Sequence, residues 1–157
     1  MTMMQNLVAG LVLALGLVAP AFCAEPVSAS FIGNTAIGGK DTVSYHAPDA
    51  RKAPLVREGD KKYEIEYLGA KWLFATKDSA DKFAADPSAF VPSYNGHCAN
   101  ALSEGEGLVK TDGAVWEFFG GKLYLFYAER GRQRWLKGDW TTFRQQADAA
   151  WRAVLKK

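Results

Sequence analysis

The sequence is poor in the side chains that bind soft metal ions. Its 157 residues include two cysteines, two histidines and three methionines. All three methionines lie among the first four residues, and Cys23 also belongs to the N-terminal segment that we interpret below as a signal peptide. Removal of that segment leaves no thioether for a copper(I) site, and it leaves one thiol, Cys98, without an intramolecular disulfide partner.

The sequence also lacks a large excess of charge of either sign, and it lacks recognisable catalytic motifs. The sequence has 19 Lys and Arg against 17 Asp and Glu, which gives a net charge of +2. This excess of positive charge is too small to indicate a surface that binds nucleic acid. The one basic cluster, Arg130, Arg132, Arg134 and Lys137, is interpreted as a solvated helix face. No Walker loop, haem-attachment motif or Ser-His-Asp order is present. The sequence therefore gives no positive support for an enzyme and predicts no nucleic-acid partner.

The first 24 residues have the pattern of a secretory signal peptide. An uncharged apolar run at 7–18 is followed by Ala-Pro-Ala-Phe-Cys-Ala, a small-residue ending typical of a cleavage site. Pro20 interrupts the run before it reaches the roughly 20 apolar residues that cross a bilayer. We therefore predict that 1–24 is removed, that the protein is exported to the periplasm, and that no membrane span remains. A retained membrane anchor and lipidation of Cys23 are the alternatives.

A first hairpin followed by a helix is predicted between residues 63 and 87. Tyrosine and isoleucine alternate with glutamate over 63–67, which is typical of a half-buried strand, and 71–75 is the returning strand after a turn. Thr76 is a good helix N-cap. The Asp86-Pro87 pair ends this helix, because a residue before proline disfavours helical geometry.

A second hairpin and two helices are predicted in the C-terminal part. The strands 115–119 and 122–127 flank a Gly-Gly pair, which accepts positive φ at both positions of a two-residue turn. A helix around 129–136 follows, and Asp139 caps a final helix. The apolar stripe of that final helix is Trp140, Phe143, Ala147, Trp151 and Val154.

These elements predict one α+β domain over 35–157. We expect two small antiparallel β-hairpins, packed with short helices and with the C-terminal amphipathic helix. Residues 25–34 are small and polar and are predicted to form a flexible N-terminal arm. A short edge strand is expected at 35–37, and a surface loop at 46–62.

Short pieces of sequence in a fixed order resemble exported YHS-domain proteins, which are small metal-associated modules. In chain order the pieces are 39–45 (GKDTVSY), 72–75 (WLFA), 83–87 (FAADP), 94–99 (YNGHCA), Trp116, 121–125 (GKLYL), Trp135 and 143–151. The resemblance covers roughly 36–151 and implies a binding module that handles a metal ion or a small ligand. Metal-binding members place cysteines where this chain has Ser44, Ala75 and Ser79, so no ligand can be transferred from that cysteine set.

Four other residues are the candidate metal ligands. Cys98, His97 and His46 are the sole strong sulfur and nitrogen ligands after residue 24, and Asp41 is a polar neighbour of His46 in sequence. A transition metal ion, copper or zinc, is the cofactor that these types would bind. His97 and Cys98 are adjacent, so only a turn, which Gly96 permits, would direct both side chains at one ion.

The function predicted from the sequence is an exported binding module with its site near Cys98. The first alternative is a thiol-redox protein, because Cys98 near a helix N-terminus and beside His97 would have a lowered pKa. The second alternative is a protein-interaction module without chemistry of its own. Inert packing of Cys98 as a small buried side chain is also open at this stage.

Overall fold

The computed structural model describes residues 25–51 and 56–157, so the predicted signal peptide lies outside the described residues. Within the described part, no helix is both long and apolar enough to cross a membrane. The elements are η1 Ile37–Gly39, η2 Thr42–His46, β1 Asp60–Tyr67, β2 Ala70–Phe74, α1 Lys77–Ala85, η3 Pro87–Ala89, η4 Ser93–Gly96, α2 Ala99–Ser103, β3 Val115–Phe119, β4 Lys122–Phe126, α3 Glu129–Lys137 and α4 Trp140–Leu155, where η denotes a 3₁₀ helix.

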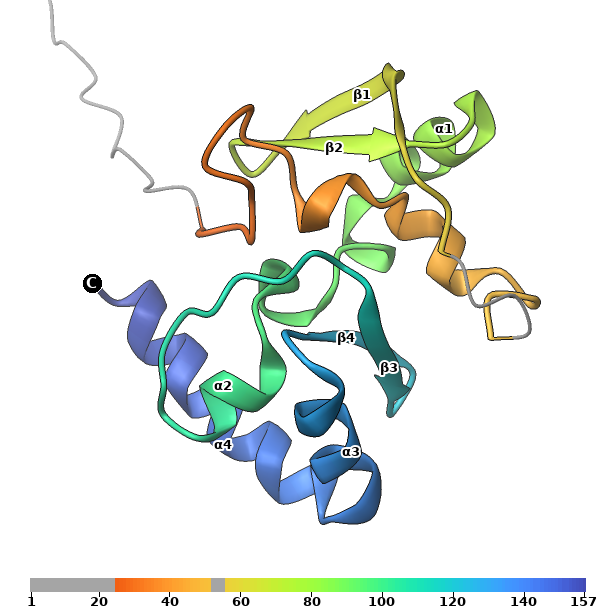
Figure 1. Ribbon diagram of the computed structural model, residues 1–157. Coiled ribbons are helices and arrows are strands. Elements are labelled where there is room, and N and C mark those ends of the chain that lie inside the picture. Colours follow the sequence, from red (N-terminus) through yellow and green to blue (C-terminus); the bar gives the residue numbers. More distant parts are fainter. Residues whose placement is uncertain (1–24, 52–55) are drawn as a thin grey trace, which may run out of the picture.

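The first hairpin, β1–β2, packs with α1 at one end of the molecule (Figure 1). Its strands are antiparallel, with Ile65 opposite Trp72, and the pairing is irregular between Asp60 and Glu64. The Phe83 ring of α1 lies 5.5 Å from the Trp72 ring. Because alternate strand residues face the same side, Trp72 and Phe74 of β2 both face this helix, and both are buried.

The second hairpin, β3–β4, packs with α2, α3 and α4 at the other end (Figure 1). Gly120 and Gly121 make the predicted turn with φ values of 57° and 77°. Trp135 of α3 is fully buried against Phe119 and Tyr124, with ring centroids 5.4 and 5.3 Å away. The predicted Asp139 cap is confirmed, because its carboxylate accepts from the backbone N–H groups at the start of α4.

The segment with η1 and η2 joins the two halves into one domain. The Tyr45 hydroxyl donates to Gly113 O at 2.7 Å, and Ile37 is fully buried. Leu123 and Leu125 of β4 belong to the same hydrophobic cluster as the first hairpin. The α+β prediction of two small hairpins with short helices and a C-terminal helix is therefore confirmed.

Three segments differ from their predictions. Part of the expected flexible arm at 25–34 packs onto the domain. The Ser28 N–H donates to Asn95 O at 3.0 Å, and the Ser28 side chain is buried. The expected edge strand at 35–37 makes only isolated bridges and runs into η1, since Ile37 has a φ of 43°. The expected surface loop at 46–62 ends early, because β1 begins at Asp60.

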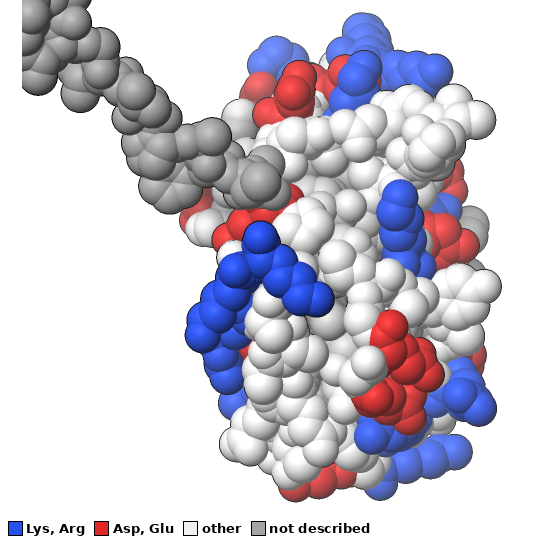
Figure 2. Space-filling model, turned by 90° about the vertical axis from the view of Figure 1, so that its left-hand side faces the viewer, with Lys and Arg blue, Asp and Glu red and all other residues white. Residues whose placement is uncertain are grey.

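Charged side chains are interspersed on the face of the molecule drawn in Figure 2. Small groups of Lys and Arg alternate with groups of Asp and Glu, and uncharged surface separates them. No single sign of charge covers this face, in keeping with a sequence whose net charge is +2.

Candidate functional site

Cys98 is a structural cap on the short helix α2. Its Sγ accepts hydrogen bonds from Ala101 N–H at 3.5 Å and from Tyr127 N–H at 3.3 Å. Its own backbone N–H donates to Val109 O at 2.8 Å, and the residue is 4% exposed. The thiol therefore joins the start of α2 to the end of β4 and fills a buried position. This geometry favours the inert-packing interpretation of Cys98.

His97 has different partners from its neighbour. Its Nδ1 lies 3.0 Å from Tyr94 O, and its ring centroid lies 6.0 Å from that of Trp151 on α4. Burial lowers the pKa of His97, and the hydrogen bond to Tyr94 opposes this only in part. The imidazole is therefore a neutral packing group under α4.

Asp41 and His46 lie at the start and end of η2. Asp41 is fully buried, and its carboxylate accepts from Val43 N–H through Oδ1 and from Ala75 N–H through Oδ2, both at 3.0 Å. It is the cap of η2 and a tie to the end of β2. His46 is exposed, and its ring lies edge-on to Phe90 at 5.2 Å.

The structure does not bring the four predicted ligands together. Among the described residues, no three His, Cys, Asp or Glu side chains form a group that could hold a metal ion. The physical reason is that Cys98, His97 and Asp41 each satisfy nearby backbone groups in different places. The copper or zinc centre expected from the sequence therefore gains no support from the geometry.

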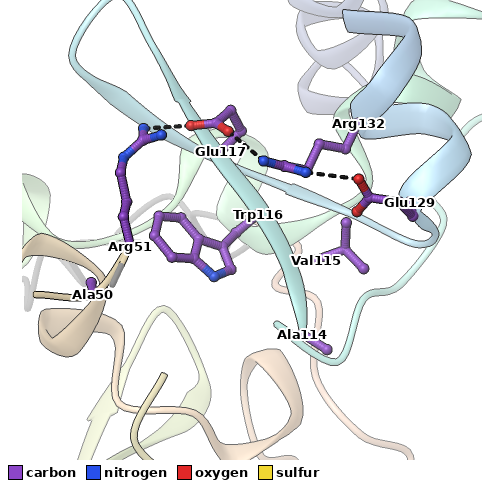
Figure 3. A pocket seen from close by; sticks show the side chains of 8 residues that line it. All are labelled: Ala50, Arg51, Ala114, Val115, Trp116, Glu117, Glu129 and Arg132. Carbon is purple, nitrogen blue, oxygen red and sulfur yellow. Dashed lines mark hydrogen bonds and ion pairs between the residues drawn. The ribbon is translucent and has the colours of Figure 1, made fainter. Parts of the chain in front are cut away.

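A polar pocket lies instead beside β3 (Figure 3). Its volume is about 530 Å³, which is within the usual range of small-ligand sites. It lies between the segment at 50–51, strand β3 and the first turns of α3. The lining residues are Ala50, Arg51, Ala114, Val115, Trp116, Glu117, Glu129 and Arg132.

Glu117 is the centre of this pocket and holds two arginines. The residue is 4% exposed, its Oε1 accepts from Arg51, and its Oε2 accepts from Arg132 at 2.8 Å. Burial would raise the pKa of Glu117, but the Phe118 N–H at 2.9 Å and the two guanidinium groups hold it below its ordinary value. Glu117 is therefore an ionised carboxylate at neutral pH, and it fixes the positions of both cations.

The two arginines give the pocket its capacity to bind. A guanidinium has five N–H donors, and Glu117 engages one nitrogen of each arginine, while Glu129 accepts from Arg132 at 2.7 Å. Figure 3 shows the chain of charges above the Trp116 ring, and the Arg51 guanidinium carbon lies 5.8 Å from the centroid of that ring. Glu117 and Glu129 balance the two guanidinium charges, so a ligand carboxylate would be recognised by further guanidinium N–H donors beside the flat Trp116 ring.

Sequence reasoning missed this pocket. The sequence pattern places Arg51 in a surface loop and Arg132 on a solvated helix face, whereas both pair with buried Glu117. One signal was present in strand 115–119, because alternate positions face the same side and Glu117 lies between Val115 and Phe119 on that side. A charged residue at an inward-facing position needs a partner, and the long-range partner could not be identified from sequence.

Comparisons of the chain with protein-family models, with curated proteins and with solved structures find no match. The resemblance to YHS-domain proteins therefore stays a prediction from the sequence. The candidate pocket is argued from its own geometry.

Proposed function

We propose that the chain is an exported binding module of the YHS type that takes a small, flat, carboxylate-bearing ligand in the pocket between Arg51 and Arg132. The observation that carries the proposal is the buried, ionised Glu117, which holds two guanidinium groups at one cavity. Because Glu117 fixes both cations before a ligand arrives, less side-chain entropy is lost on binding.

Binding fits these residues better than catalysis does. The carboxylate of Glu117 is held by two cations and a backbone N–H, so its lowered pKa makes it a poor proton acceptor at neutral pH. The thiol that a redox function would use is buried and accepts two backbone hydrogen bonds. Arg51 and Arg132 are permanently charged and serve to position an anion.

The test is calorimetric titration of the protein with acetate, benzoate and indole-3-carboxylate. Arg51→Ala is the informative variant, because Arg51 is 58% exposed at its side chain and Glu117 keeps Arg132 as a partner. A charge-assisted hydrogen bond contributes about 1.5–3 kcal/mol, so we expect benzoate to bind roughly 10- to 100-fold more weakly to this variant. Arg130→Ala is the matched control, since Arg130 is exposed on the same helix as Arg132 and does not line the pocket.

The outcome for the aromatic acids decides between two interpretations of the arginines. Tighter binding of benzoate than of acetate would support contact with Trp116 as well as with the guanidinium groups. No heat with any of the three acids, or equal affinities in Arg51→Ala and wild type, would overturn the proposal. The Arg51–Glu117–Arg132 network would then be a structural tie between the segment at 50–51, β3 and α3.

A further inference from the structure

His46 separates two cavities on a part of the surface that the carboxylate pocket does not use. One cavity of about 420 Å³ lies between η2 and α1, and one of about 350 Å³ lies between η3 and the start of β4. His46 lines both. The other lining residues are Val43, Ser44, Ala47, Pro48, Arg57, Ser79, Lys82 and Phe90 in the first, and Ser88, Ala89, Val91, Ser93, Gly121, Lys122 and Leu123 in the second.

The charged groups at these cavities are all of one sign. Arg57 and Lys82 line the first, Lys122 lines the second, and none of the described residues that line either cavity is acidic. Two nearby carboxylates moderate this field: Asp78 accepts from Lys82 at 2.8 Å, and Asp86 accepts from the Ser88 hydroxyl of the second cavity at 2.6 Å. The lining still has a surplus of positive charge and attracts an anion.

The imidazole of His46 is held in place by two aromatic rings. Its centroid lies 5.2 Å from Phe90 and 5.0 Å from Phe118, and both rings are nearly perpendicular to it. Arg57 is placed by its backbone, whose N–H donates to Ser44 Oγ at 3.1 Å and whose carbonyl accepts from Asp41 at 2.9 Å. The cationic residues therefore line the same two cavities as an imidazole ring that packs against two aromatic side chains.

We propose that the two cavities around His46 form a binding site for a phosphate group, carried by a small organic molecule or present as the free ion. Lysine is a compact point charge that suits phosphate, and arginine supplies several donors to it. Phe90 and Val43 provide apolar surface for the organic part of an ester. This inference does not rest on the carboxylate pocket, because the two sites share no lining residue.

The test follows the ring resonances of histidine by NMR during titration with phenyl phosphate. The chain has two histidines, and His97 lines neither cavity, so its buried ring is an internal reference. Saturable shifts of the His46 resonances with a constant His97 signal are the expected result. Inorganic phosphate, titrated separately, distinguishes the sources. Equal affinities for inorganic phosphate and phenyl phosphate would identify the free ion as a sufficient ligand. Tighter binding of phenyl phosphate would identify a phosphate ester as the ligand.

Two lysine variants of α1 give a matched comparison. Lys82→Gln removes a cation that lines the cavity, and Lys77→Gln removes a cation of the same helix that is paired with Asp81 in the same i,i+4 manner but lies outside it. We expect Lys82→Gln to weaken phenyl phosphate about tenfold and Lys77→Gln to leave its affinity unchanged. Equal effects of the two variants, or no His46 shift at millimolar phosphate, would overturn the proposal.

A cross-test separates this site from the carboxylate pocket. Arg51→Ala is expected to lose benzoate binding and to keep the phosphate-induced shift of His46. Lys82→Gln is expected to keep benzoate binding and to weaken the binding of phenyl phosphate that shifts the His46 resonances. A loss of both activities in either variant would mean that one shared site, or a general loss of structure, explains the binding, and would overturn the separate phosphate site.

Discussion

Replacement of Asp41 by alanine is the sharpest test of the structural role that the fold gives this residue. The two carboxylate oxygens accept from Val43 N–H and Ala75 N–H, both at 3.0 Å, and the side chain is fully buried. Each buried N–H left without a partner costs about 1–3 kcal/mol. Since Ala75 is only partly buried, water can relieve the cost there, and we expect a total loss of about 3 kcal/mol.

A loss of that size is large beside the stability of an ordinary domain, which is about 5–15 kcal/mol. It corresponds to a fall in melting temperature of roughly 10 °C for a chain of this length. Urea unfolding, followed by the fluorescence of the five tryptophans, measures it, with Asp49→Ala as an exposed control. A change below about 1 kcal/mol would refute the capping argument.

Three further predictions concern the segment at 94–99. Native Cys98 is expected to react with a thiol reagent only as fast as the protein unfolds, and rapid modification of the folded protein would favour the redox alternative. Burial lowers the pKa of His97, so its contribution to stability is present above about pH 6.5 and is lost as the pH falls through the folded-state value. Acid-range stability curves of wild type and His97→Gln measure it, and identical slopes would contradict it. Gly96→Ala is expected to lower the free energy of unfolding in urea by at least about 2 kcal/mol. The reason is that Gly96 has a φ of +82° and that a Cβ there would clash with Ile37 Cγ2. A stability equal to wild type would show that the corner relaxes.

The hairpins and helices were predictable because their signals are local. The glutamates that alternate with apolar residues over 63–67, the Thr76 and Asp139 caps and the glycine turn each lie within a few residues of the element they define. Such signals depend on backbone geometry and on burial of one face, and neighbours in sequence supply both. The limits of the second hairpin and of α3 accordingly agree with the structure to within one residue, whereas β1 begins three residues earlier than predicted.

The candidate sites were not predictable because their partners are distant in sequence. Arg51 meets Glu117 across 66 positions, and no local pattern records that contact. The sequence identifies His46 as a candidate ligand, but only the fold places it at the same cavity as Arg57 and Lys82. Composition indicates which side chains are available, whereas tertiary packing decides which of them share a cavity.

The segment at 94–99, which carries part of the resemblance, forms a tight corner of the fold. Tyr94, Asn95 and Gly96 all have positive φ, so three consecutive residues turn the chain sharply before α2. The corner is held by contacts distant in sequence, since Asn95 O accepts from Ser28 N–H at 3.0 Å and the Tyr94 hydroxyl donates to Asp148 at 2.8 Å. The side chains of Tyr94, Asn95 and His97 each make a hydrogen bond that helps to hold this corner. A motif of this kind specifies a fold, and ligand binding is then expected where charged side chains converge on open cavities.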